Sequence, residues 1–202
     1  GGSSWGSSET DPSGGMTNSS IYGTPGFCSQ DSTIFMTYSH AGDSGSSGSA
    51  FYDRVYLYEW TAASHWTAMN GGAEVSIPYT GSPPSANAWE PAVACATSGN
   101  PMVAWVEMDP PSSDADHALL AEVTSSSVSR SPPLSRNSSS GSYTTDVYTV
   151  GIAVDGSGHT YLAHWEQHHS EQWRSDLYVT RYSGGTFTPL GASLGQDYDS
   201  NN

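Results

Sequence analysis

Two glutamates at matching points of two similar segments are the first candidates for chemistry. Glu107 ends PAVACATSGNPMVAWVE and Glu166 ends VGIAVDGSGHTYLAHWE, and a shift of 59 residues aligns the two segments. Two carboxylates about 5–9 Å apart are what glycoside hydrolysis requires. A residue that recurs at the end of a repeated strand is more often shared architecture, so we expect a structural role for both and keep catalysis as the alternative.

A group of histidines surrounds the second of these glutamates. His164, His168 and His169 accompany Glu166, and imidazole and carboxylate groups are ligands of zinc and other transition ions. His164 coincides with a tryptophan and a tyrosine in the similar segments, which indicates a packing slot for a large ring. His168 and His169 lie where the segments differ, so they are the remaining metal candidates, although a regular ligand spacing is missing.

Aspartates gather in the stretches HAGDSGSSGSAFYD and EMDPPSSDADH. Clustered oxygen ligands suit Ca²⁺, but the fixed spacing of an EF-hand loop is absent. We therefore expect solvated loops and no bound cofactor, with Ca²⁺ as the alternative ligand and Asp109 and Asp114 as its candidates beside the loop histidines. The aspartates of the two stretches are Asp43, Asp53, Asp109, Asp114 and Asp116.

The aromatic residues make up 11% of the chain and include seven tryptophans. Exposed tryptophans could serve as stacking platforms for sugars, but most of these rings fall at repeated strand positions, where rings usually fill a core. Trp66 and Trp173 are better candidates for exposed stacking than Trp89 or Trp105.

The two cysteines fall at one point of the repeated pattern. A shift of 67 residues places Cys28 on Cys95, and Val154 takes the same point in a third copy, so the slot is apolar. Because a free cysteine packs as a small hydrophobe, the sequence favours two buried thiols. A disulfide is the alternative, which would need Cα atoms within about 7 Å and would indicate an oxidising compartment.

All of these residues belong to a repeat of four short strands. RVYLYEW, HALLAEV and DLYVTRY align as third strands, and His65-Trp66, Val128 and Phe187 mark short fourth strands. In the third copy we expect strands at 148–154, 160–166, 176–182 and 186–190. The turn Asp155-Gly156 before the second of these is a strong hairpin signal. The opening GGSSWGSS matches SGGTFTPL, so residues 1–20 are predicted to hold a fourth strand and a linker.

Four-stranded units of about 50–60 residues resemble the blades of a β-propeller. The pattern AVDxxGxxYxAxW, which runs here from Ala153 to Trp165, is similar to the hairpin between the first two strands in many extracellular bacterial propellers. The resemblance implies an all-β, β-propeller-like fold: three four-stranded blades plus an N-terminal strand that completes a further blade. The predicted blades are 21–70, 71–135 and 136–202, the last with a C-terminal tail. Known propellers have at least four blades, so this implies a partial or assembled ring.

Composition excludes some partners. Twenty acidic residues face five arginines and no lysine, and a net charge of −15 would repel a nucleic-acid backbone. No apolar run approaches the ~20 residues that span a bilayer, so the chain is not expected to span a membrane. A composition rich in Ser, Thr, Gly, Asn and Tyr and free of Lys favours secretion to the extracellular space or the periplasm.

A nucleophile–base set and a cofactor motif are both missing from the pattern. We therefore expect a non-catalytic, exported interaction or structural module, acting as an accessory subunit or as part of a larger protein. Its partners would be other protein chains that complete the propeller or cover exposed blade faces. The alternative is a propeller that binds or cleaves carbohydrates, with glycans as ligands. A sialidase is disfavoured because the SxDxGxTW box of that family has no match here.

Overall fold

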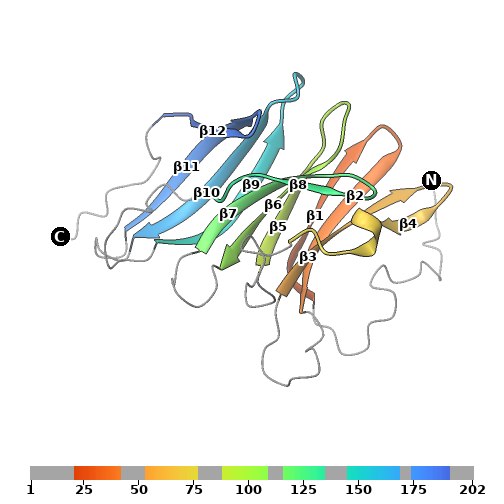
Figure 1. The fold of residues 1–202 in the computed structure, drawn as a ribbon, viewed down its shortest axis with the longest axis horizontal. Helices are drawn as coiled ribbons and strands as arrows, with labels where there is room; N and C mark the ends of the chain where they lie inside the picture. Colours follow the sequence, from red (N-terminus) through yellow and green to blue (C-terminus); the bar gives the residue numbers. More distant parts are fainter. Residues whose placement is uncertain are drawn as a thin grey trace, which may run out of the picture.

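The protein folds into three antiparallel β-sheets of four strands each (Figure 1). The computed structural model describes residues 21–41, 53–76, 88–108, 116–134, 145–168 and 174–191. Within these ranges the only helical segment is one 3₁₀ turn, Asn70–Gly72. None of the described segments forms a helix long and apolar enough to cross a bilayer. The all-β class expected from the sequence is confirmed.

Each sheet uses four consecutive strands in chain order. Sheet 1 consists of β1 (Ile21–Gln30), β2 (Thr33–Ala41), β3 (Asp53–Thr61) and β4 (His65–Ala68). Sheet 2 consists of β5 (Ala88–Ala94), β6 (Met102–Met108), β7 (Asp116–Val123) and β8 (Val128–Arg130). Sheet 3 consists of β9 (Thr145–Val154), β10 (Thr160–His168), β11 (Arg174–Ser183) and β12 (Thr186–Pro189). The four strands predicted in the third copy are confirmed, and the fourth strands of the other copies lie where the sequence placed them.

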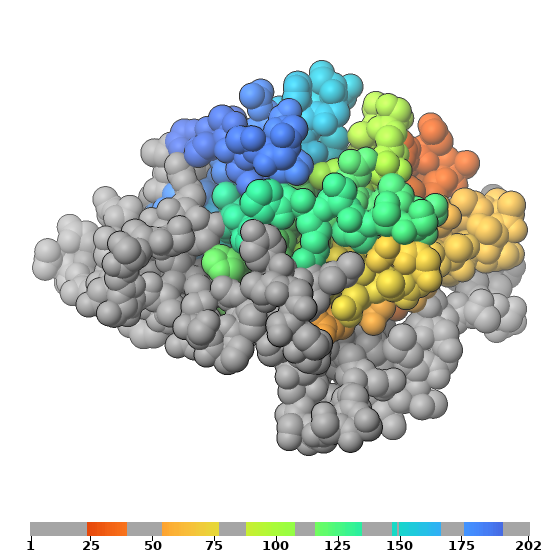
Figure 2. All heavy atoms as spheres, in the orientation of Figure 1, coloured from red at the N-terminus to blue at the C-terminus, as the bar shows by residue number. Residues whose placement is uncertain are grey.

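The sheets lie side by side in chain order, with the first strands β1, β5 and β9 in contact (Figure 1). In the space-filling view, the region of β7 and β8 lies between the blue atoms of sheet 3 and the yellow atoms of sheet 1 (Figure 2). Each junction between neighbouring sheets is filled by its own apolar cluster. Val103, Trp105 and Leu119 pack toward sheet 1, whereas Ala104, Val106 and Leu120 pack toward sheet 3.

Side-chain alternation explains how one strand serves two clusters. Successive residues of a strand point to opposite faces of the sheet, so the odd-numbered residues of β6 face sheet 1 and the even-numbered residues face sheet 3. Apart from Glu107, both sets are apolar, which fits a sheet that is covered on both sides. Sheets 1 and 3 each have one neighbour in the described structure, and each keeps one face that points away from the array.

A glycine allows sheets 1 and 2 to approach closely. A Cβ at Gly26 of β1 would meet the Val93 nitrogen at 3.3 Å and the Ala92 Cα at 3.4 Å, both in the backbone of β5. It would also meet Thr37 Cγ2 at 3.1 Å. These contacts are tight, so the packing of the first strands favours the residue without a side chain.

Each first strand also carries a β-bulge beside the aromatic residue that the repeat places there. The register shifts between Tyr22 and Gly26 in β1 and between Trp89 and Ala92 in β5, and Tyr148 is the extra residue in β9. The bulge of β1 contains one more residue than that of β5. The repeat correspondence therefore changes by one residue downstream of it.

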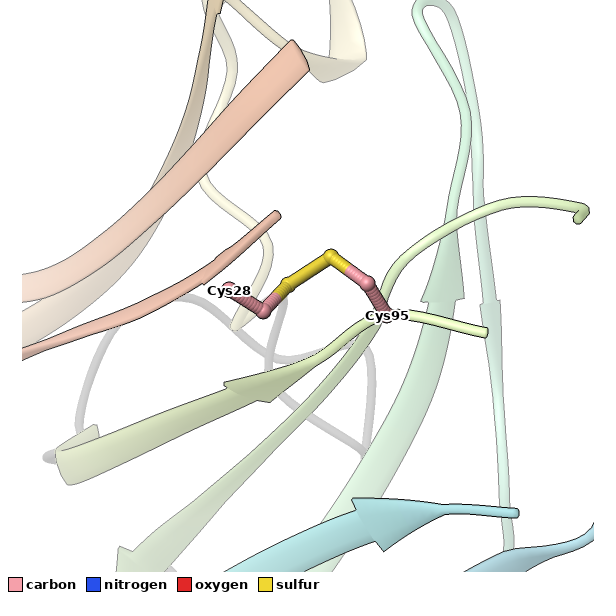
Figure 3. Close-up of a disulfide and its surroundings, with 2 residues drawn as sticks. All are labelled: Cys28 and Cys95. Atoms are coloured by element: carbon pink, nitrogen blue, oxygen red, sulfur yellow. A yellow bond between two sulfur atoms is a disulfide. The ribbon is translucent and has the colours of Figure 1, made fainter. Parts of the chain in front are cut away.

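This difference of one residue determines whether the two cysteines can form a disulfide. Cys28 pairs with Phe35 and Ala94 pairs with Met102, so the structural equivalent of Cys28 is Ala94. Cys95 follows one position later, just beyond β5, and points back toward sheet 1. The two residues form a disulfide with a Cα–Cα distance of 5.7 Å (Figure 3). The favoured expectation of two free thiols is wrong, because true equivalents would have pointed in the same direction and could not have met.

Candidate functional site

The first candidate glutamate forms a buried pair with a tryptophan of the same strand. Trp105 Nε1 donates a hydrogen bond of 3.0 Å to Glu107 Oε2, and the two residues are 0% and 4% exposed. Residues two apart on a strand share a face, which brings the ring and the carboxylate together. Arg130 of β8 lies with Nη2 3.6 Å from the same carboxylate oxygen and its guanidinium carbon 5.2 Å from the centre of the Trp105 ring.

The second candidate glutamate repeats this arrangement in sheet 3. His164 Nε2 lies 2.9 Å from Glu166 Oε1, and both side chains are fully buried. The imidazole donates this bond when Nε2 carries the proton. The His164 ring stacks on Tyr178 at a centroid distance of 5.6 Å, and the Tyr178 hydroxyl donates to Asp176 at 3.3 Å. The predicted ring slot at His164 is confirmed.

Both pairs are explained by a structural role, in which a neighbouring ring stabilises a buried carboxylate. A buried carboxylate needs hydrogen-bond donors to offset its loss of water, and a ring N–H two residues away on the same strand supplies one in each sheet. Glu107 faces sheet 1 and Glu166 faces sheet 2, and neither carboxylate is accessible to a substrate. Catalysis by these two residues would require one of the sheet junctions to open.

A network of charges extends from Glu107 toward sheet 1. Arg54 Nε lies 3.0 Å from Glu74 Oε2, and Glu74 and Glu107 both interact electrostatically with Arg130. Burial raises the pKa of Glu74, and the Arg54 and Arg130 guanidinium groups partly offset that rise. Burial also lowers the pKa of Arg130, against the opposing effect of Glu107 and Glu74. The sequence reasoning missed this network, which its few arginines at strand positions could have indicated.

The hairpin between β9 and β10 is held by Asp155. Its Oδ1 accepts hydrogen bonds from the backbone N–H groups of Ser157 and His159, each at 2.9 Å. Its Oδ2 accepts from the Tyr161 hydroxyl at 2.9 Å and lies 2.9 Å from His159 Nδ1. These bonds, led by the backbone N–H of His159, hold the pKa of Asp155 well below its usual range. The hydrogen bond to Asp155 in turn raises the pKa of Tyr161.

The motif AVDxxGxxYxAxW therefore has a structural explanation. Its Asp and Tyr close the hairpin, and its central glycine, Gly158, adopts a positive φ of 82° that favours glycine. The Asp, Gly and Tyr of the motif therefore define the turn geometry, whereas its last residue, Trp165, is 48% exposed.

Most metal candidates lie outside the described residues: His169, Asp43, Asp109 and Asp114, as does the stacking candidate Trp173. His168 is the last residue of β10, and Asp53 and Asp116 begin β3 and β7. Among the described residues, no three His, Cys, Asp or Glu side chains are grouped to hold a metal ion. The metal and Ca²⁺ hypotheses therefore stay predictions.

An open cleft of about 270 Å³ lies between sheets 2 and 3 at the hairpin end. Its lining includes Asn100, Glu122, Thr160 and Tyr182, and Asn100 Nδ2 donates to Glu122 Oε1 at 2.7 Å. Asn100 and Glu122 are themselves exposed. The cleft offers a few polar groups to a small ligand but no buried charged group aimed into it.

The outward face of sheet 1 is rich in rings. We use this name for the side chains that point away from sheet 2. Met36 pairs with Phe27 and Tyr58, and Ile34 pairs with Trp60, so these residues share that face. Phe27 and Ile34 are 59% and 38% exposed. The face also holds the half-buried Trp66 and the stacked rings of Tyr38 and Tyr56, 6.1 Å apart. Tyr38 and Tyr58 are buried, at 3% and 8% exposed.

The outward face of sheet 3 is composed mainly of small and aliphatic residues. Tyr161, Ala163 and Trp165 of β10 point away from sheet 2, because Leu162 and His164 point toward it. Trp165 is 48% exposed, and Leu190, which lies opposite Val179, is 49% exposed. The remaining members of this face are Gly151, Ala153, Leu177, Val179 and Arg181.

The two outward faces thus contain four of the five large hydrophobic side chains that are exposed in the described part of the chain. Two of them lie on each face: Phe27 and Ile34 on sheet 1, Trp165 and Leu190 on sheet 3. Comparison of the sequence with protein-family models and with the curated proteins found no match.

Proposed function

We propose that this protein is a non-catalytic, exported interaction module whose two outward faces bind partner chains. The observation that carries the proposal is the concentration of exposed apolar side chains on those faces: Phe27 and Ile34 on sheet 1, Trp165 and Leu190 on sheet 3. Both faces of sheet 2 are buried against neighbouring sheets. On the outward face of sheet 1, Tyr38 and Tyr58 are buried as well, at 3% and 8% exposed, so the exposed apolar area there is that of Phe27 and Ile34. A chain with a net charge of −15 has ample polar surface, so apolar end faces call for partners.

The architecture we propose is a β-propeller-like array of three blades. Support comes from the chain order of the strands, from the adjacent first strands and from the bulge that recurs in each of them. In a propeller, the face of one blade covers the face of the next. Among the described residues, sheets 1 and 3 each have one neighbouring sheet, so each has one face that no described sheet covers.

The candidate catalytic residues support a binding role. Glu107 and Glu166 are buried and accept hydrogen bonds from neighbouring rings, which accounts for their positions without a substrate. The disulfide between Cys28 and Cys95 supports export, because such bonds persist in oxidising compartments.

The test is an assay of the purified, oxidised chain for glycan binding and for hydrolysis of a panel of glycosides. We expect neither activity. Turnover that is lost in Glu107→Gln or Glu166→Gln, in variants that retain the wild-type circular dichroism spectrum, would overturn the proposal in favour of a glycosidase. Binding to arrayed glycans that is lost in Trp66→Ala would overturn it in favour of a lectin.

A further inference from the structure

We infer that the open cleft between the hairpin ends of sheets 2 and 3 binds a guanidinium group, carried either by a small organic cation or by an arginine side chain of a partner chain. The inference goes beyond the proposed function, because the cleft lies between two sheets and apart from their outward faces. Its volume of about 270 Å³ is just below the roughly 300–1,000 Å³ of most ligand pockets, so it suits a group of a few heavy atoms.

The chain itself fills the matching junction between sheets 1 and 2. The Cys28–Cys95 disulfide joins the two sheets there. Gln30 reaches from the end of β1 to the hairpin between β5 and β6. With its amide nitrogen directed at the Gly99 carbonyl, 3.1 Å away, its amide oxygen accepts hydrogen bonds from the backbone N–H groups of Ser98 and Gly99, each at 3.2 Å.

Shorter side chains leave the corresponding space open between sheets 2 and 3. Ala94 and Val154 take the places of the two cysteines, so a disulfide cannot form there. Ala96 takes the place of the glutamine, two residues further along the first strand of its sheet, and lines the cleft together with Gly158. The cleft is therefore the position at which a side-chain amide enters the other junction, and here that position is left for a ligand.

Hydrogen-bond acceptors and one negative charge lie on the sheet 2 wall of the cleft. Of the described residues that line it, Glu122 is the only charged one, and its side chain is exposed. Asn100 Nδ2 donates to Glu122 Oε1 at 2.7 Å, which leaves Asn100 Oδ1 and the second Glu122 oxygen as acceptors. A ligand that donates hydrogen bonds and carries a positive charge fits this wall. The net charge of −15 also attracts cations to the protein.

The sheet 3 wall favours a planar cation. Tyr182 lines the cleft, and its ring packs against Phe187 at a centroid distance of 4.9 Å. A guanidinium group stacks on aromatic rings and donates to a carboxylate through two parallel N–H groups, whereas an ammonium is a compact and strongly hydrated charge. Ca²⁺ takes about six to eight oxygen ligands, usually with several carboxylates, and this cleft has one carboxylate.

The experiment is a titration of the oxidised chain with n-butylguanidinium chloride, followed by proton–nitrogen correlation NMR at neutral pH. We expect binding with a Kd on the order of 1 mM, because the probe is small and the cleft is open. The amide signals that move should include those of Gly99, Gly158 and Gly184, which line the cleft. The neutral planar analogue n-butylurea should bind at least about 10-fold more weakly. Shifts confined to other parts of the chain, or equal binding of the two probes, would overturn the inference.

Three variants locate the site, each checked for the wild-type circular dichroism spectrum. Glu122→Gln should weaken binding of n-butylguanidinium by at least about 10-fold. Asp31→Asn removes the same charge from an exposed turn of sheet 1 and should leave binding unchanged. Ala96→Gln should fill the cleft and abolish the shifts of its amides. Equal weakening in Glu122→Gln and Asp31→Asn would contradict the inference, because the probe would then respond to net charge alone.

Two further titrations identify the ligand. A blocked glycine–arginine–glycine peptide that binds as tightly as n-butylguanidinium would assign the cleft to an arginine side chain of a partner chain, and binding of the free cation alone would assign it to a small molecule. If CaCl₂ moved the same amides at lower concentrations than the guanidinium probe, the cleft would be a metal site and the inference would be wrong.

These outcomes are separable from those of the proposed function. A cleft that binds no guanidinium leaves an interaction module that uses its outward faces. Glycosidase turnover or glycan binding contradicts the proposed function and leaves the guanidinium titration unaffected.

Discussion

Removal of the Cys28–Cys95 disulfide should lower the stability of the protein by several kcal/mol. The bond closes a loop between residues 67 positions apart and joins sheet 1 to sheet 2. A cross-link of this kind restricts the unfolded chain, and for a loop of this length the chain-entropy model gives about 4 kcal/mol at 25 °C. We expect the double variant Cys28→Ala/Cys95→Ala to lose that amount, and its urea midpoint to fall by roughly 1.5–2 M.

Urea unfolding followed by tryptophan fluorescence and circular dichroism would measure this loss. Peptide mapping without reductant should first recover the peptides of Cys28 and Cys95 linked. Dithiothreitol should destabilise the wild type by a similar amount and leave the double variant unchanged, which separates the bond from other effects of the reductant. A loss below about 1 kcal/mol in the double variant would refute the reasoning, because the cross-link would then not constrain the unfolded chain.

Three further substitutions test the packing and hydrogen bonding. Gly26→Ala should lower the free energy of unfolding by about 1–3 kcal/mol, because its Cβ meets the backbone of β5. Gly156→Ala, with open space around it, should lower it by less than about 0.5 kcal/mol. Equal losses for the two variants in urea titrations would contradict the close approach of β1 to β5. Trp105→Phe removes the donor to Glu107 and should cost about 1–3 kcal/mol, so an unchanged urea midpoint would count against that bond. Because the folded-state pKa of Asp155 is lowered, its stabilising contribution is present above about pH 4 and is lost as the pH falls through the folded-state value. The stability of Asp155→Asn should therefore fall less steeply in acid than that of the wild type. Parallel plots of stability against pH for the two proteins would contradict this.

The repeat explains why much of the fold could be predicted from the sequence. Four short strands per copy were visible because alternation of side chains and small-residue turns are local features, and β9 to β12 lie where that pattern placed them. The ring slot at His164 was predictable because two other copies carry rings at the same position. The metal candidates His169, Asp109 and Asp114 lie outside the described residues and stay predictions.

The cysteines show where such reasoning fails. The alignment placed Cys28 on Cys95 and implied parallel, separate thiols. One additional residue in the bulge of β1 moves Cys28 onto Ala94, so that Cys95 points to the opposite side. A shift of one residue reverses the direction of a side chain in a strand, and the length of a bulge is not visible in a single sequence.

The sequence by itself determined the all-β class, the three copies and the strands within them, because strand periodicity is a property of neighbouring residues. Only the tertiary structure decided which face of each strand meets which sheet. The candidate catalytic residues Glu107 and Glu166 are buried there. They lie within hydrogen-bonding distance of Trp105 and His164, respectively. The fold also places Phe27 and Trp165, two exposed residues far apart in the chain, on the outward faces at opposite ends of the array of sheets. The physical reason is that burial depends on contacts between sheets, which no local pattern encodes.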